Sequence, residues 1–112
     1  MDQYIIAVDF DGCICKNAFP NIGEPNFEVI DDLKRRQQEG TAVILWTCRE
    51  DQYLKDAVDF CEVYGLVFDA VNDNIPEINE EFGKNSRKVF ANEDWDDRAV
   101  TKEFKQPEEL LL

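Results

Sequence analysis

The chain has 112 residues, of which 44% are hydrophobic and 33% charged, and its formal net charge is −13. This length and apolar content predict a single folded domain over residues 1–112 with one modest core, rather than a disordered chain. The sequence contains no histidine. Its absence excludes the commonest general base and the Ser-His and Cys-His nucleophile pairs, so catalysis would have to use carboxylates, lysine, hydroxyls, thiols or a metal.

The charge and hydropathy patterns also restrict the partners. A strongly acidic chain is a poor match for nucleic acid, because polyanions are held by clustered lysine and arginine. No apolar run approaches the roughly 20 residues that cross a bilayer, and the chain starts without a signal-peptide pattern, so we expect a cytoplasmic protein with no membrane partner. The four cysteines form no CxxC pair, which argues against structural zinc and favours reduced thiols.

The first half of the chain alternates strand and helix patterns. An apolar run predicts a strand over residues 3–10, and a stretch rich in Pro, Gly and Asn predicts a loop over 13–26. Apolar residues at helical spacing predict helices over 27–39 and 51–64, each followed by a glycine. Between them, the continuous apolar run at 41–47 is typical of a strand buried on both faces.

The second half gives weaker signals. A short strand is expected over residues 66–71, one or two helical turns over 76–82, and a fourth strand over 89–95 whose apolar pattern is interrupted by polar residues. Strands separated by helices favour right-handed crossovers. The predicted fold class is therefore α/β, with a single Rossmann-like domain whose mostly parallel sheet is flanked by helices.

Two carboxylates end the first predicted strand. Asp9 and Asp11 stand one residue apart and are followed by Gly12. Residues i and i+2 of a strand face the same side, so these carboxylates could share a metal and a substrate. A site that collects negative charge away from water usually holds a cation, because an unpaired buried charge costs several kcal/mol. The alternative is an Asx-type turn with a solvated Asp9.

Other polar residues also follow predicted strands. Thr47 ends the second strand, and the pair Asp96-Asp97 follows the fourth. In parallel sheets, ligands bind beyond the carboxyl ends of the strands, near the point where the strand order reverses. The sequence therefore predicts that these residues meet Asp9 and Asp11 at one edge of the sheet.

These features resemble those of the haloacid dehalogenase-like (HAD) phosphohydrolases. Within that family, they look like a small branch of enzymes from bacteria and phages that lacks a large cap. The resemblance spans residue 4 to about residue 98. It rests on an ordered set of motifs: Asp9-Phe10-Asp11-Gly12, Thr47, Lys88 and Asp96-Asp97, together with the stretches 44–49 and 68–72.

The resemblance implies roles for the acidic residues. Asp9 would be the nucleophile that forms an aspartyl-phosphate. Asp11 would act as general acid for the leaving oxygen and then as general base for water. Mg²⁺ would be held by Asp9, by the backbone carbonyl of Asp11, and by a carboxylate of either Asp96 or Asp97, an all-oxygen site that suits this ion.

The resemblance also implies phosphate ligands. Thr47 and Lys88 would donate to the phosphoryl oxygens and stabilise the transition state. Lys84 competes with Lys88 for this role. Arg49 could reach the substrate phosphate or could instead pair with one of the two acidic residues that follow it.

The chain departs from the family pattern at two points. Cys13 stands where the family usually has Thr or Ser, and a thiol is a weak hydrogen-bond donor. The segments 13–26 and 72–88 are too short for the cap that many HAD enzymes insert there, so no substantial cap domain is expected. An open site would be covered by a large substrate or by a second subunit of a homo-oligomer, or it would discriminate poorly.

The resulting hypothesis is a Mg²⁺-dependent phosphomonoester hydrolase that acts on a small phosphorylated substrate. One alternative is a regulatory module that binds Mg²⁺ and phosphate with little turnover. The other is a nucleic-acid end phosphatase, which the net charge disfavours. The sequence does not name the substrate.

Overall fold

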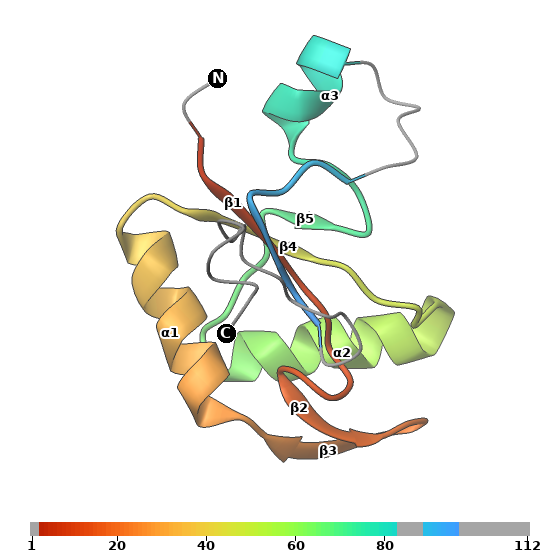
Figure 1. Ribbon diagram of the computed structural model, residues 1–112. Coiled ribbons are helices and arrows are strands. Elements are labelled where there is room, and N and C mark those ends of the chain that lie inside the picture. Colours follow the sequence, from red (N-terminus) through yellow and green to blue (C-terminus); the bar gives the residue numbers. More distant parts are fainter. Residues whose placement is uncertain (1–2, 83–88, 97–112) are drawn as a thin grey trace, which may run out of the picture.

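The computed structural model in Figure 1 describes residues 3–82 and 89–96. Within them, a four-stranded parallel sheet has the order β5-β4-β1-β6. Its strands are β1 (Ile5–Val8), β4 (Ala42–Leu45), β5 (Ala70–Val71) and β6 (Glu93–Trp95). The sequence-based prediction of an α/β fold with a parallel sheet is confirmed.

Helices cover both faces of this sheet. They are α1 (Phe27–Gln38), α2 (Asp51–Val63) and α3 (Pro76–Phe82). Alternate residues of a strand point to opposite faces, so β1 and β4 each contribute to two apolar clusters. One cluster joins the two strands to α1 and α2, and the other joins them to α3 (Figure 1). All eight residues of β1 and β4 are buried, which explains their continuous apolar sequence.

The boundaries of α1 follow its capping residues. The Asn26 side chain accepts a hydrogen bond from the Val29 amide at 3.4 Å and begins α1. Gly40 follows the end of α1 with a φ of +100°, a conformation that costs glycine little. The predicted helices over 27–39, 51–64 and 76–82 are confirmed to within a residue or so.

The predicted loop over 13–26 is wrong, because this segment contains an antiparallel hairpin. Its strands are β2 (Cys15–Ala18) and β3 (Asn21–Pro25). Only Cys15 is buried in the hairpin, so the chain shows no alternation of apolar and polar residues. The prolines and the glycine of the segment are typical of turns, and they therefore favoured a loop where the structure has two exposed strands.

The outer strands of the sheet are shorter than predicted because side chains replace part of the backbone ladder. The Asp69 carboxylate accepts from the Val43 amide at 2.7 Å, next to the two-residue strand β5. The Asn92 side chain accepts from the Ile5 amide at 2.8 Å, just before β6. Polar residues at the start of the fourth strand therefore complete the sheet rather than interrupt it.

The strand order reverses at β1, because β4 lies on one side of it and β6 on the other. The carboxyl ends of these three strands meet at one edge of the sheet, which is where such folds bind ligands.

In the part of the chain that the structure describes, no helix combines the length and apolar character needed to cross a membrane.

Candidate active site

A pocket of about 730 Å³ lies at the carboxyl ends of the central strands. Its walls combine carboxylates, hydroxyl and amide groups, one arginine and two aromatic rings. The lining residues are Asp9, Asp11, Asn17, Phe19, Trp46, Thr47, Cys48, Arg49, Asn72 and Asp96. Four residues predicted to converge from the ends of three strands, Asp9, Asp11, Thr47 and Asp96, therefore line one pocket.

Asp9 is held by the central strand. Its backbone amide donates to the Trp95 carbonyl at 2.8 Å, so the β1–β6 ladder continues one residue past β1. Its Oδ1 accepts from the Phe10 amide at 2.8 Å, which fixes the carboxylate beside its own backbone. Asp9 is partly exposed and lines the pocket.

Asp11 lies in a tight turn rather than in the strand. The amides of the next residues, Cys13, Ile14 and Cys15, converge on the Phe10 carbonyl at 3.0–3.3 Å. Gly12 has a φ of +84°, which lets the chain reverse there without a Cβ clash. Asp9 and Asp11 thus face one pocket because of this turn, and not through the strand alternation that the sequence suggested.

Arg49 forms a bidentate ion pair with Asp11. Its Nε donates to Asp11 Oδ2 and its Nη2 to Asp11 Oδ1, both at 2.8 Å. The Arg49 side chain is 1% exposed and that of Asp11 is 17% exposed. The hydrogen bonds to Asp11 raise the pKa of Arg49, so the guanidinium stays charged despite its burial. An ion pair was one of the two roles considered for Arg49, but its partner is Asp11 rather than a sequence neighbour.

The same guanidinium also fastens the hairpin to the site. It donates to the carbonyls of Asn21 at 2.9 Å and Pro20 at 3.4 Å, in and beside the turn between β2 and β3. It stacks over the rings of Phe10 and Phe19, with distances of 5.0 and 5.1 Å to the ring centroids. One buried arginine therefore joins the floor of the pocket to its hairpin wall.

Thr47 is positioned by the ends of two strands. Its amide donates to Asn72 Oδ1 at 2.7 Å, and its Oγ1 accepts from the Arg49 amide at 3.2 Å. Asn72 adopts a left-handed φ of +51°, which asparagine tolerates better than most residues, and its amide donates to the Leu45 carbonyl at 2.7 Å. Asn72 was not predicted as a site residue, although its place directly after a predicted strand was a usable signal.

Asp96 lies directly after β6, is exposed, and lines the pocket with Asp9. Among the described residues, no three His, Cys, Asp or Glu side chains are grouped closely enough to hold a metal ion. Mg²⁺ nevertheless fits the donor chemistry here, because it takes one or two carboxylates and keeps several waters. Lys88, its competitor Lys84, and Asp97 lie outside the described residues, so their predicted roles remain predictions.

The cysteines differ in their surroundings. Burial raises the pKa of Cys61 to about 12 and also raises that of Cys15, which makes both thiols unreactive packing residues. Cys13 is half-buried and packs against the core, while Cys48 is exposed on the pocket wall. A weak donor at position 13 is tolerated because the turn is held by backbone amides.

Four further lining residues were missed by sequence reasoning: Asn17, Phe19, Trp46 and Cys48. The first two belong to the hairpin that was predicted as a loop. Trp46 was interpreted as part of a strand buried on both faces, but it is 41% exposed. Nothing in the local pattern distinguishes such a tryptophan from a core residue.

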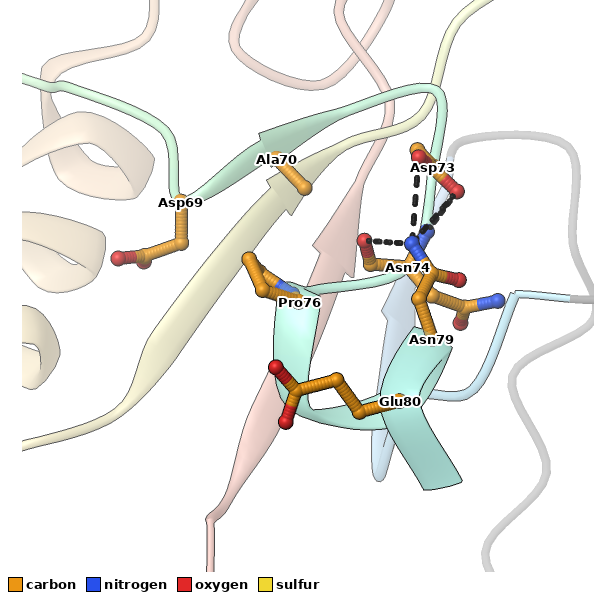
Figure 2. Close-up of a pocket in the computed structure, with 7 residues that line it drawn as sticks. All are labelled: Asp69, Ala70, Asp73, Asn74, Pro76, Asn79 and Glu80. Carbon is orange, nitrogen blue, oxygen red and sulfur yellow. Dashed lines mark hydrogen bonds between the residues drawn. The ribbon is translucent and has the colours of Figure 1, made fainter. Parts of the chain in front are cut away.

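A second pocket, of about 420 Å³, lies between β5 and α3, and Figure 2 shows its lining. Asn79 donates to both carboxylate oxygens of Asp73 at 3.4 Å and to the Asn74 carbonyl at 3.3 Å. The buried Asn74 side chain accepts from the Phe90 amide at 2.6 Å. The Asn79 bonds fasten α3 to the connection before it, and the Asn74 bond joins that connection to the segment at Phe90. None of the residues predicted to act in catalysis lines this second pocket.

Comparison with solved structures identifies a relative. A conserved protein from Bacteroides thetaiotaomicron has 41% sequence identity to this chain and superposes with a TM-score of 0.77, over 88% of this chain and 79% of that one. The chain belongs to the same family as that protein. No protein-family model matches the chain, and no curated protein matches it. The likeness to the Bacteroides relative establishes the fold and the kinship.

Proposed function

We propose that the protein is a Mg²⁺-dependent phosphomonoester hydrolase of the HAD type. The observation that carries this proposal is the pocket at the switch point, where Asp9 and Asp11 follow the central strand and Thr47 and Asp96 follow its two neighbours. Carboxylates, a hydroxyl and a metal are among the means of catalysis that remain for a chain without histidine.

In the proposed reaction, a carboxylate oxygen of Asp9 attacks phosphorus as the bond to the leaving oxygen breaks. Asp11 gives its proton to that oxygen. Asp11 then takes a proton from a water molecule that attacks the aspartyl-phosphate, which releases inorganic phosphate and restores the Asp9 carboxylate. Each proton and bond is thereby accounted for within the two carboxyl groups, the ester and water.

Thr47 would contact the transferring phosphoryl group. Its Oγ1 accepts one hydrogen bond from the Arg49 amide, and a hydroxyl that accepts can still donate its own proton. Mg²⁺, held by Asp9, the Asp11 carbonyl and Asp96 or Asp97, would neutralise charge on the phosphate when bound. Arg49 is 2% exposed, so we assign it to positioning Asp11 rather than to direct contact with the phosphate.

The Arg49–Asp11 pair also favours one alternative, a module that binds Mg²⁺ and phosphate with little turnover. Two charge-assisted hydrogen bonds stabilise the Asp11 carboxylate. Both carboxylate oxygens of Asp11 are thus engaged by Arg49. A carboxyl group occupied in this way fits a module that holds its ligand without turning it over.

Phosphate release from an aryl phosphate, with and without Mg²⁺, tests the proposal. We expect Mg²⁺-dependent release that is lost in Asp9→Asn, where the Phe10 amide can keep its acceptor while the nucleophile is gone. Calorimetric binding of inorganic phosphate in the presence of Mg²⁺, without release from any ester, would instead identify the binding module. Absence of both binding and release would exclude the proposed site.

A further inference from the structure

Two aromatic side chains line the same pocket as the carboxylates and are largely uncovered. Phe19 is 55% exposed and Trp46 is 41% exposed, and both face the pocket that holds Asp9. A third ring, Tyr53, is 48% exposed and contacts Phe19 at a centroid distance of 5.5 Å. Single exposed aromatics are ordinary on protein surfaces, but rings grouped around a polar cavity mark a place where a ligand is covered.

The fold places both aromatic residues at the pocket. The Trp46 amide donates to the Val8 carbonyl at 2.9 Å, so Trp46 extends the central ladder of the sheet. Phe19 belongs to the turn whose carbonyls bind Arg49, and its ring stacks on that guanidinium. The Phe19 ring and the backbone of Trp46 are therefore in place before any ligand binds, which lowers the entropy lost on binding.

We propose that the pocket takes a nucleoside monophosphate, with its base against Phe19 and Trp46 and its phosphate toward Asp9 and Thr47. This inference rests on the proposed function and names the substrate class of the same site. Bases stack on aromatic side chains, and the Asn17 side chain on the same wall offers its amide NH2 as a donor to a base edge, while its Oδ1 accepts from the Phe19 amide at 3.3 Å. A volume of about 730 Å³ lies in the range of small-molecule sites.

The charge of the protein selects a mononucleotide over a nucleic-acid strand. A net charge of −13 repels a polyanion, whereas the two charges of one phosphomonoester can be neutralised locally by Mg²⁺. The base supplies the remote contacts that the phosphate cannot, since a large cap is absent from the described residues.

The test compares kcat/KM for adenosine 5′-monophosphate, ribose 5-phosphate and phenyl phosphate with Mg²⁺ present. We expect the nucleotide to be preferred over ribose 5-phosphate by about tenfold or more, the usual effect of one base stack. Trp46→Ala and Phe19→Ala should each reduce that ratio severalfold. Phe27→Ala, which removes a 52% exposed ring outside the pocket, is the matched control and should keep the ratio.

A binding measurement separates this inference from the proposed function. In the Asp9→Asn protein, adenosine 5′-monophosphate should quench tryptophan fluorescence more than ribose 5-phosphate, and Trp46→Phe should remove the difference. Quenching in this variant, together with no phosphate release from any ester by the wild-type protein, would leave the nucleotide site standing and refute hydrolysis. Equal hydrolysis of nucleotide and sugar phosphate, unaffected by Trp46→Ala, would refute the nucleotide site and leave hydrolysis standing.

Discussion

Arg49 donates to both carboxylate oxygens of Asp11, each at 2.8 Å, across 38 positions of sequence. The cation that balances the carboxylates at the end of β1 is therefore supplied in part by the chain itself. A bound metal has to compensate fewer negative charges than the DxDG sequence alone suggests, because Asp11 already has its counter-ion.

Arg49→Ala should destabilise the fold by about 3–5 kcal/mol, because it leaves Asp11 without its partner in a largely buried place. The stability of Arg49→Lys should lie between that of the wild type and that of Arg49→Ala, since lysine keeps the charge but loses the bidentate geometry. Urea denaturation measures both. Arg35→Ala is the matched control, because its pair with Asp32 is exposed and should change stability by less than about 1 kcal/mol. Equal losses of stability in the two alanine variants would show that the Arg49–Asp11 pair contributes no more than an exposed ion pair.

Asp9→Asn should abolish phosphate release and leave the melting temperature close to that of the wild type, because the amide oxygen can still accept from the Phe10 amide. Asp11→Asn should slow release by roughly 10²–10⁴-fold, the usual contribution of a general acid–base group. Steady-state kinetics on an aryl phosphate, with thermal unfolding as the fold check, measures both. Substantial activity in purified Asp9→Asn would remove the aspartyl-phosphate route.

Mg²⁺ should raise the melting temperature in proportion to the logarithm of its concentration above Kd, because it binds the folded state preferentially. Asp96→Ala, or Asp97→Ala if the second residue of the pair is the ligand, should reduce that shift and the activity together. Asp31→Ala removes an exposed carboxylate from α1 and serves as the charge-matched control. A wild-type Mg²⁺ response in both single variants would refute the metal assignment.

Stability should fall at low pH through Glu93. The hydrogen bond from Tyr4 Oη at 2.6 Å is the main cause that lowers the pKa of Glu93, with help from Trp95 and Arg36. A lowered pKa means that Glu93 stabilises the fold fully above its ordinary value of 4.5, and that this stabilisation is lost as the pH falls through the lowered value. Denaturation of Glu93→Gln across the acid range should show a shallower loss of stability than the wild type. Identical acid profiles would contradict this role.

The same hydrogen bond between Tyr4 and Glu93 should also affect stability at alkaline pH. It raises the pKa of Tyr4 above its ordinary value of 10.0, so Tyr4 stabilises the fold below pH 10.0 and loses that effect as the pH rises through the raised value. Tyr4→Phe should therefore flatten the alkaline fall in stability. A spectroscopic titration of tyrosine absorbance reads the ionisation directly, and an unshifted titration in the wild type would contradict the assignment.

Gly23→Ala should disrupt the hairpin, because a Cβ at this position would lie 2.1 Å from the Lys16 carbonyl oxygen on the paired strand. Backbone atoms cannot move aside as a flexible side chain can, so a loss of about 1–3 kcal/mol is expected. Glu24→Ala on the same strand removes only an exposed ion pair with Lys16 and is the control. Equal stability of the two variants would show that the hairpin adapts freely.

Much of the fold could be predicted from local sequence pattern. The strands β1 and β4 are buried on both faces, and their unbroken apolar runs reflect that directly. The helices α1 and α2 bury one stripe each, which the spacing of Ile30 and Leu33, and of Ala57 and Cys61, made visible. Positions at strand ends followed from the elements, so the meeting of Asp9, Thr47 and Asp96 could be predicted as well.

The rest depends on contacts that local pattern does not encode. The hairpin is exposed, so no apolar alternation marked its strands. The partner of Arg49 lies far away in sequence, and the charge of Arg49 alone does not indicate which of the many carboxylates it pairs with. Trp46 resembles a core residue because it ends an apolar strand, and only the packing of the complete fold leaves it 41% exposed.

The central position of β1 has a consequence for how the pocket opens. Its residues are bonded on both sides, and the Asp9 amide is held by the Trp95 carbonyl, so amide hydrogens along this strand should be among the slowest to exchange with solvent. The hairpin is exposed and bonded largely to itself, so its amides should exchange by small local openings. The hairpin wall of the cavity should therefore open locally more often than the strand that positions Asp9, although Arg49 keeps its turn attached to the site.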